Sequence, residues 1–551
     1  MSATNNENQY STLIAGGGIA GLVTALVLLE QGQTNLAIVD RDTPERLGGL
    51  ARWAFGGMAL CGTKEQQRAN IADSPERLLH DWHCFADFKD DDHWPKLWAQ
   101  AYANNNHQQV YLWLKQLGLR FLPAVNWVER GLYGEGNSLP RYHVLWGTGW
   151  QLVETIIAKL QPYLVEQKLQ IFHQHKVITP IFSTTSNSSE QSAAQASVIG
   201  ALVLNEQSQQ QATFHCQNLV IACGGINGSL TNVRKHWPAD SVAPSSMLNG
   251  ANPISDGQLH QAINNAGGKL TNLTNMWNYA AGIAHPQAEF EAHGLSLIPC
   301  KSALWLNYLG ERIGPMPLVT GFDTHYLCQQ VAKQAQPWTW QLMNWRIAIK
   351  ELAVSGSLHN PSIRDSKLIS FLKEILFGNK RLVKQLLAES TELICADTLD
   401  ELCEKMNQLT PHAYISSEQL NQTVSDFDQQ FAHGITLTND DQLRRIQHAR
   451  QWRPDKLRTC KPKAFLTKDA GPLIAIKTQL ISRKSLGGLQ TNLASQVITE
   501  TGEPMANLYC VGEAAGFGGG GASGLRSLEG TFLSGCILTA KSAAKAIIDK
   551  Q

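Results

Sequence analysis

Glycine-rich segments near both ends of the chain have the residue types that bind the phosphates of a dinucleotide. The strand-like residues 12–15 (TLIA) run into the hexapeptide GGGIAG at residues 16–21, and an apolar, helix-like stretch follows at residues 22–29. Gly16 permits a tight turn, Gly18 lets the backbone approach a pyrophosphate, and Gly21 lets the helix pack closely on the strand. The pyrophosphate is expected at the helix N-terminus, where backbone N–H groups are free.

The surroundings of this hexapeptide are those of a βαβ unit. Residues 36–39 predict a second buried strand, which ends at Asp40. An acid about 20 residues beyond the glycines is where a ribose hydroxyl is bound. Near the C-terminus, residues 508–511 predict another buried strand, followed directly by Gly512 and Glu513. The two segments are best explained as halves of one flavin site, with Glu513 next to the ribityl hydroxyls.

Composition indicates a folded protein with a large core. The 551 residues include 46 basic and 46 acidic side chains, so no net charge favours nucleic acid as a partner. The eleven cysteines show no metal-type spacing, and we expect no metal site and a reducing, cytoplasmic location. The polar first eight residues do not resemble a signal peptide, and no transmembrane segment is expected.

The first half of the chain predicts mixed α and β structure. Helices are expected within residues 92–117 and 152–164, and β-strands within 169–182 and 197–205, joined by an exposed polar loop at 183–196. The apolar residues 219–222 predict a buried strand that ends at the pair Gly224 and Gly225. Residues 47–57 contain a second glycine cluster without periodicity, which suits backbone passing close to a flat ligand.

From about residue 286 the pattern changes to long amphipathic helices, notably at 362–390 and 398–409, and near residue 480 it returns to short strands and glycines. This pattern indicates an α/β fold in which a Rossmann-like domain carries an inserted α+β cap. We assign residues 1–285 and 479–551 to the nucleotide-binding domain and residues 286–478 to the cap.

Together these motifs resemble the flavoprotein subunits of succinate dehydrogenase and fumarate reductase and their relatives, the 3-ketosteroid dehydrogenases. The resemblance covers nearly the whole chain, from the GGGIAG hexapeptide to residues 524–532 (GLRSLEGTF). It implies a glutathione-reductase type of fold, with a parallel sheet and a β-meander, and FAD as the cofactor. The segment at residues 50–53 has no histidine, so FAD is expected to be held noncovalently.

The resemblance and the motifs together identify a set of cofactor-binding positions. These are Gly16, Gly18, Ile19, Ala20, Gly21, Asp40, Arg41, Gly48, Gly49, Ala51, Gly56, Gly57, Gly224, Gly512, Glu513, Leu528 and Thr531.

The catalytic residues of fumarate reductases are only partly present. The resemblance places one histidine at His285, but it places Phe322 where the cap arginine donates a proton and Ser527 where an arginine holds a carboxylate. Fumarate and succinate are therefore not expected as substrates. Arg483 and Lys484 fall near the flavin by resemblance and could stabilise an enolate or the anionic cofactor. The candidate catalytic residues are Arg483, Lys484, His285, Tyr279 and Tyr326.

The resulting hypothesis is an FAD-dependent dehydrogenase that transfers hydride between flavin N5 and a CH–CH bond beside a carbonyl. Its substrate is expected to be a small hydrophobic ketone, either steroid-like or otherwise cyclic. Its electron acceptor is unknown. Two alternatives remain at this point: a flavin-dependent oxidase of another substrate class, and a non-catalytic FAD-binding protein.

Overall fold

A parallel sheet forms the centre of the nucleotide-binding unit. The computed structural model describes residues 8–183, 197–432 and 434–550, and all but one residue of the expected loop at 183–196 lies outside them. The sheet order is β19-β20-β8-β1-β2-β5, and all of its pairs except β19–β20 are parallel. Strands β6 and β7 extend β8 as an antiparallel meander, which confirms the predicted architecture. The strands are β1 (Gln9–Ala15), β2 (Leu36–Val39), β5 (Leu169–Phe172), β6 (His175–Phe182), β7 (Val198–Asn205), β8 (Gln211–Ile221), β19 (Gln496–Ile498) and β20 (Pro504–Cys510).

Helices from both ends of the chain cover this sheet. Helix α1 packs against α7 and against the C-terminal helix α19, so the first and last segments of the chain share one apolar core. The helices of this unit are α1 (Ile19–Glu30), α2 (Gly49–Trp53), α3 (Lys64–Arg68), α4 (Pro75–Ala86), α5 (His93–Asn105), α6 (Trp113–Gln116), α7 (Thr148–Val165), α8 (Leu230–Lys235), α9 (Gln258–Asn265) and α19 (Thr531–Asp549). A π-helical segment, Asn106–Leu112, joins α5 to α6.

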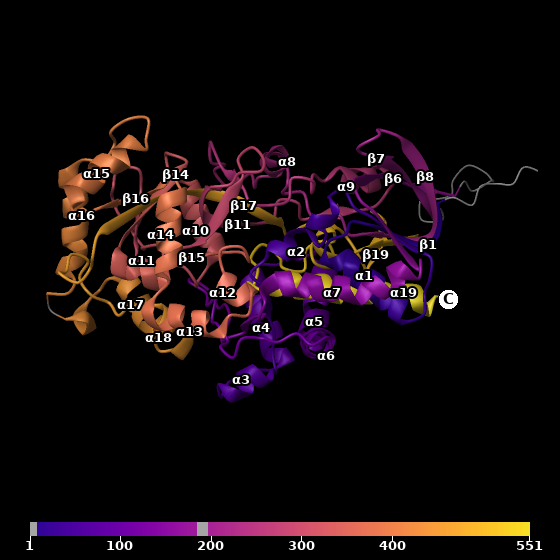
Figure 1. Cartoon of the computed structure of the whole chain (residues 1–551), viewed down its shortest axis with the longest axis horizontal. Helices are drawn as coiled ribbons and strands as arrows, with labels where there is room; N and C mark the ends of the chain where they lie inside the picture. Colours follow the sequence, from indigo (N-terminus) through magenta and orange to yellow (C-terminus); the bar gives the residue numbers. More distant parts are fainter. Residues whose placement is uncertain (1–7, 184–196, 433, 551) are drawn as a thin grey trace, which may run out of the picture.

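A second, mainly antiparallel sheet forms the cap, at the left of Figure 1. Its order is β13-β14-β17-β11-β12-β15, and β9 and β16 also pair with β17. The strands are β9 (Leu248–Asn249), β11 (Met276–Ala284), β12 (Gly294–Ile298), β13 (Leu304–Leu306), β14 (Trp338–Asn344), β15 (Ala353–Val354), β16 (Leu393–Ala396) and β17 (Leu473–Ser485). Two short ribbons, β3 (Gly57–Ala59) with β4 (Tyr142–Val144) and β10 (Leu270–Thr271) with β18 (Gly488–Leu489), complete the strands.

Amphipathic helices pack on the cap sheet around a separate core. In α15, Thr398 caps the N-terminus, and Leu399, Leu402, Cys403 and Met406 are buried at helical spacing, as the sequence at 398–409 predicts. The cap helices are α10 (Thr324–Ala332), α11 (Trp345–Glu351), α12 (Pro361–Arg364), α13 (Leu368–Phe377), α14 (Lys380–Glu389), α15 (Leu399–Gln408), α16 (Ser417–Gln429), α17 (Asp441–Ala449) and α18 (Arg453–Arg458).

Two local predictions differ from the structure. The single helix expected at residues 362–390 is broken into α12, α13 and α14. Ser366, with a φ of 55°, lies between α12 and α13, and Gly378, with a φ of 83°, ends α13 before Asn379 caps α14. The glycine cluster at 47–57 is not wholly irregular, since it contains the short helix α2 and the start of β3.

The two proposed domain boundaries fall beside the strands that connect the units. Strand β11 ends one residue before the boundary at 285/286, and β17 spans the boundary at 478/479. Both strands are in the cap sheet, where they pair with each other, and β17 runs from the cap into the nucleotide-binding unit (Figure 1).

One helix has the length and composition of a membrane span. Among the described residues, α19 alone meets this test, and 61% of its most apolar window is buried in the protein. Its apolar side chains pack in the core with α1, so burial inside the fold accounts for them.

Candidate active site

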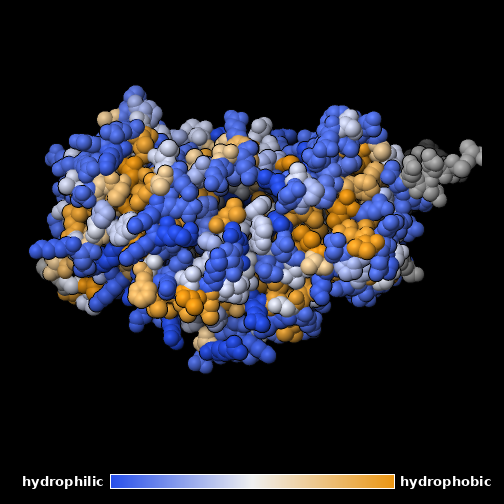
Figure 2. Space-filling view, in the orientation of Figure 1, coloured by the Kyte–Doolittle hydropathy of each residue, from blue (hydrophilic) through white to orange (hydrophobic). Residues whose placement is uncertain are grey.

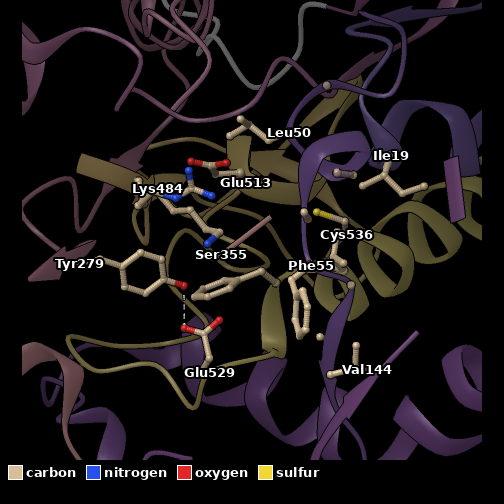
Figure 3. A pocket seen from close by; sticks show the side chains of 18 of the residues that line it. Ile19, Leu50, Phe55, Val144, Tyr279, Ser355, Lys484, Glu513, Glu529 and Cys536 are labelled. Atoms are coloured by element: carbon tan, nitrogen blue, oxygen red, sulfur yellow. Dashed lines mark hydrogen bonds between the residues drawn. The ribbon is translucent and has the colours of Figure 1, made fainter. Parts of the chain in front are cut away.

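A cleft of about 530 Å³ lies between the two units and is lined by residues from both. One end is built from the hexapeptide, Asp40 and the 48–57 segment, and the other from β11, β17 and the cap. Figure 3 shows Lys484, Tyr279 and Glu529 on one side of this cleft, with Phe55 and Val144 across it.

Two glycines of the hexapeptide occupy positions that require glycine, and a third faces the cleft. Gly16 has a φ of 116°, and a Cβ there would lie 2.3 Å from the carbonyl oxygen of Ala222. A Cβ on Gly21 would lie 2.1 Å from the carbonyl oxygen of Gly16. A Cβ on Gly18 would have no neighbour closer than 4.0 Å, because this residue faces the cleft. The backbone therefore has the conformation that the motif predicts.

The start of α1 is open to the cleft. Gly18 precedes the helix and offers no side-chain cap, and Ile19 and Ala20 line the cleft. The first N–H groups of a helix have no intrahelical partners, and they attract anionic phosphate groups. This end of α1 fits a pyrophosphate.

Asp40 lies at the end of β2, as predicted, and its carboxylate accepts hydrogen bonds from the N–H groups of Gly17 and Asp42. Burial raises the pKa of Asp40 above its ordinary value. The neighbouring Arg41 also lines the cleft, but its guanidinium forms ion pairs with Glu206 and Asp256. The two carboxylates therefore hold the Arg41 guanidinium in place.

Most of the predicted cofactor positions line the cleft, and four do not. Those in the lining are Gly16, Gly18, Ile19, Ala20, Asp40, Arg41, Gly48, Gly49, Ala51, Gly56, Gly57, Gly224 and Glu513. Gly21 and Gly512 instead provide close packing, since a Cβ on Gly512 would lie 2.8 Å from that of Ala20. Leu528 is buried in the core, and Thr531 bonds to the hydroxyl of Ser527.

Glu513 reaches the cleft from the strand end of β20. Its Oε1 accepts a hydrogen bond from the N–H of Ser485 at 2.9 Å. A Cβ on Gly225 would lie 2.4 Å from the same oxygen, so the glycine is required for the carboxylate to lie there. Burial raises the pKa of Glu513 to about 7.

Three of the five candidate catalytic residues come together at the cap end of the cleft. Strand β11 supplies Tyr279, and β17 supplies Arg483 and Lys484. The guanidinium of Arg483 lies 5.9 Å from the centre of the Tyr279 ring and donates to the carbonyl of Gly250. The Nζ of Lys484 lies 5.6 Å from the Tyr279 ring and 4.3 Å from that of Phe532.

The other two candidates lie elsewhere. The ring of His285 stacks on that of His293 with centroids 4.2 Å apart, and it does not line the cleft. Tyr326 packs against Tyr133 instead of the cleft, because α10 turns its first residues in different directions and only Thr324 and Leu327 reach the lining. The structure therefore separates these residues from the convergent group.

Glu529 is a residue that the sequence analysis missed. Its Oε2 accepts hydrogen bonds from the Tyr279 hydroxyl at 3.0 Å and from the indole N–H of Trp277 at 2.8 Å. The dashed line in Figure 3 marks the first of these. Glu529 directly precedes Gly530, which has a φ of 102° and is the residue before α19. A carboxylate beside a glycine at the start of a predicted helix is the sequence signal that could have identified Glu529.

The charges around Tyr279 set its protonation. Burial and the nearby Glu529 carboxylate raise the pKa of Tyr279 well above its ordinary value, so the phenol is protonated at neutral pH. Burial lowers the pKa of Lys484 to about 8, although Glu529 favours its charged form. The site therefore combines a phenol, its carboxylate acceptor and a cation that loses its proton just above neutral pH.

A second acid, Glu129, lines the cleft and was also missed. Its two oxygens accept hydrogen bonds from the N–H and the hydroxyl of Thr324 at the start of α10. Burial raises the pKa of Glu129 to about 8.

This shifted pKa predicts a pH-dependent effect of Glu129→Gln. The folded protein keeps the proton of Glu129 at pH values where the unfolded chain, with an ordinary pKa of 4.5, has lost it. The stabilising contribution is therefore complete below about pH 4.5 and is lost as the pH rises through about 8. The amide of glutamine cannot ionise and can bond to the same two groups of Thr324. Urea unfolding should show Glu129→Gln gaining stability relative to the wild type between pH 5 and pH 9.

Glu135→Gln removes an exposed carboxylate of the same surface loop and serves as the control. A Glu129→Gln difference that does not change with pH would show that Glu129 ionises normally in the folded protein.

The cap side of the cleft is largely apolar. Leu297 and Ile298 of β12, Leu327 of α10 and Val354 of β15 contribute to this wall, together with Phe371 and Ile375 of α13. Polar cap residues, including Lys301 and Arg458, lie among them. A largely apolar wall opposite a small polar group is the usual form of a site for a hydrophobic ligand.

The fumarate reductase positions differ from a dicarboxylate site. Phe322 is buried between the guanidinium groups of Arg130 and Arg445, 5.7 and 5.8 Å from its ring centre, and does not line the cleft. Ser527 is buried and bonds to Ser523. Phe322 has no acidic proton, Ser527 has no charge, and neither residue lines the cleft where a carboxylate would bind.

The glycines at 518–521, which could have formed a flexible loop beside the flavin, form a packed turn instead. A Cβ on Gly518 would lie 2.6 Å from the Trp98 ring, and one on Gly520 would lie 2.1 Å from the Thr271 hydroxyl.

One group of possible metal ligands occurs among the described residues, outside the cleft. His80, Cys84 and Glu135 lie close together, and all three are exposed.

Comparison with known proteins supports the fold and the cofactor. Residues 11–533 match the FAD binding domain family. A KsdD-like steroid dehydrogenase of Mycolicibacterium smegmatis is 35% identical over 539 residues, which cover 95% of each chain. The solved 3-ketosteroid delta1-dehydrogenase of Sterolibacterium denitrificans has a TM-score of 0.69 at 15% identity, covering 99% of this chain and 100% of its own. A flavocytochrome c3 fumarate reductase has a TM-score of 0.67 at 17% identity, covering 99% of this chain and 79% of its own.

The fold and the cleft define a flavoprotein oxidoreductase with an inserted cap. The chain belongs to the FAD binding domain family and, within it, groups with the KsdD-like steroid dehydrogenases. It is an FAD-dependent enzyme of the dehydrogenase type.

The residues present fit FAD. The uncapped start of α1, the cradle around Gly18 and the Glu513 carboxylate lie along one continuous cleft. Among the described residues that line it, the sole histidine is His175, on β6, while the segment at residues 50–53 has none.

We therefore expect FAD to be held noncovalently. Heat-denatured protein should release intact FAD into the supernatant, where absorbance and chromatography identify it. Flavin that remains with the precipitated polypeptide would contradict this prediction and would direct attention to His175 or a cleft cysteine as the attachment point.

Proposed function

We propose that this enzyme oxidises a CH–CH bond next to the carbonyl group of a small hydrophobic, steroid-like ketone. The observation that carries the proposal is the hydrogen-bonded pair of Tyr279 and Glu529, beside Lys484, facing the apolar wall of the cap. The names of the relatives support the steroid-like class. Bound FAD supplies hydride acceptance.

The residues of this chain supply the proton chemistry in the proposal. The oxygen of Tyr279 takes the proton from the carbon beside the carbonyl while its own proton passes to Oε2 of Glu529. The carboxylate becomes a carboxylic acid, so charge moves away from the substrate. The ammonium of Lys484 stabilises negative charge that develops in the cleft.

The apolar cap wall determines which substrates enter. Leu297, Leu327 and Val354 offer no hydrogen bonds to a polar substrate, whereas a fused-ring ketone can bury its hydrocarbon surface against them. The eleven cysteines are all free, which agrees with a reducing location, and we propose that the enzyme is cytoplasmic.

Substrate oxidation coupled to an artificial dye tests this function. The FAD-loaded enzyme should reduce the dye with 4-androstene-3,17-dione, and should not do so with a steroid that lacks the ketone. With reduced dye as donor, fumarate reduction should remain at background, because Phe322 and Ser527 provide neither the acid nor the carboxylate clamp. Robust fumarate reduction, or oxygen-dependent oxidation of an amine or alcohol without ketone activity, would overturn the proposal.

A further inference from the structure

Helix α13 places apolar side chains on the outside of the protein. Seven of its ten residues are apolar, yet none is buried. A helix that is apolar all round is normally enclosed in a core or in a membrane. Single exposed apolar residues are ordinary, whereas a continuous exposed patch marks an interaction site.

The two sides of α13 face different surroundings. Phe371 and Ile375 line the substrate cleft. Ile369, Leu376 and Phe377 are 72%, 67% and 70% exposed and do not line the cleft. We call the exposed set of α13 the α13 patch; it comprises Leu368, Ile369, Leu372, Leu376 and Phe377. Figure 2 shows hydrophobic residues gathered over α13 along the lower edge of the molecule.

The segment around the patch is basic, although the chain as a whole is neutral. Residues 361–385 include six Lys or Arg and two carboxylates. Asp365 pairs with Arg364 and Lys367, and Glu374 lies 4.0 Å from Arg381. Lys373, Lys380 and Lys384 form no ion pair within the part of the chain that the structure describes.

We propose that the α13 patch docks on the surface of an anionic lipid bilayer. Apolar side chains on a surface helix insert at the boundary between headgroups and acyl chains, and flanking cations attract anionic lipids. A second copy of this chain is a poorer partner, because two basic segments would face each other. Since Phe371 and Ile375 belong to the same helix, docking would place the cleft beside the lipid, where a hydrophobic ketone dissolves. This last step rests on the proposed function, whereas the docking itself does not.

Vesicle sedimentation of the FAD-loaded full-length protein tests the docking. The wild type should bind vesicles of phosphatidylcholine with phosphatidylglycerol, more weakly in high salt and more weakly to phosphatidylcholine alone. Combined Ile369→Ser, Leu376→Ser and Phe377→Ser should weaken binding at least tenfold, and Lys380→Glu with Lys384→Glu should remove the preference for anionic vesicles. The matched control replaces Val165 and Leu437, 74% and 72% exposed outside the patch, by Ser and should bind like the wild type.

No vesicle binding, or equal binding by the triple variant, would overturn the proposal. Sedimentation velocity identifies the main alternative: a wild-type dimer that the triple variant converts to a monomer, without vesicle binding, would make the patch a self-interface. Turnover of dissolved ketone separates the two proposals. Ketone turnover by a wild type that does not bind vesicles would refute the docking and leave the proposed function intact. Vesicle binding by a wild type that does not turn over the ketone would refute the proposed substrate class and leave the docking intact.

Discussion

Replacing Tyr279 by Phe is expected to lower kcat with a ketone substrate by about 10²–10⁴-fold, the usual contribution of a positioned general acid or base. The ring stays, and only the hydroxyl that donates to Glu529 is lost. FAD content and melting temperature should change little, because the phenylalanine ring fills the same space and Trp277 still donates to Glu529. Steady-state kinetics measure kcat, flavin absorbance measures FAD content, and thermal unfolding measures the melting temperature.

Tyr326→Phe is the matched control. It removes the same hydroxyl from a tyrosine that packs against Tyr133 instead of the cleft, and should leave kcat unchanged. Glu529→Gln should lower kcat in the same direction as Tyr279→Phe, since an amide cannot take the phenol proton. Wild-type kcat in Tyr279→Phe, or a comparable loss in Tyr326→Phe, would show that the proton leaves by another residue.

Lys484→Met is expected to lower the flavin reduction potential and to slow reduction by the ketone about 10²–10³-fold, the effect of losing one preorganised donor in an active site. The Nζ of Lys484 lies over the Phe532 ring beside the cleft, and methionine fills much the same space. Burial already disfavours the charge of Lys484 more than the nearby carboxylates favour it, so the melting temperature should change little.

The pH dependence distinguishes this role from simple packing. Because burial lowers the pKa of Lys484 to about 8, its positive charge is present at pH 7 and is lost as the pH rises through 8. The difference in potential between the wild type and Lys484→Met should therefore shrink between pH 7 and pH 9.5. Redox titration at both pH values is the measurement, and a variant that matches the wild type at pH 7 in potential and rate would refute the assignment.

The pairing of β11 with β17 explains why these residues meet. In the antiparallel register Trp277 lies opposite Lys484 and Tyr279 opposite Ile481, so residues about 200 positions apart in sequence are neighbours. Glu529 approaches from the segment before α19 and joins both aromatic side chains of β11. Three separate parts of the chain thus build the proton-transfer group.

The sequence by itself determined the cofactor end of the site. The roles of Gly16, Gly18 and Gly21 are local, because each depends on a turn, a helix start and a strand within a few residues. Asp40 and Glu513 were predictable for the same reason, since Asp40 directly follows β2 and Glu513 comes three residues after the end of β20. The α/β fold and the inserted cap followed from the order of these patterns, and the meander followed from the family resemblance.

Only the tertiary structure decided the catalytic end. Sequence position made His285 and Tyr326 as good candidates as Tyr279, but strand register and the direction of α10 bring only Tyr279 into the cleft. Glu529 lies 250 residues from Tyr279, and no local pattern reports a hydrogen bond over that separation. Backbone motifs that bind phosphate are fixed by neighbouring residues, whereas a side-chain group that moves protons depends on which strands pair, and the chain settles that by long-range packing.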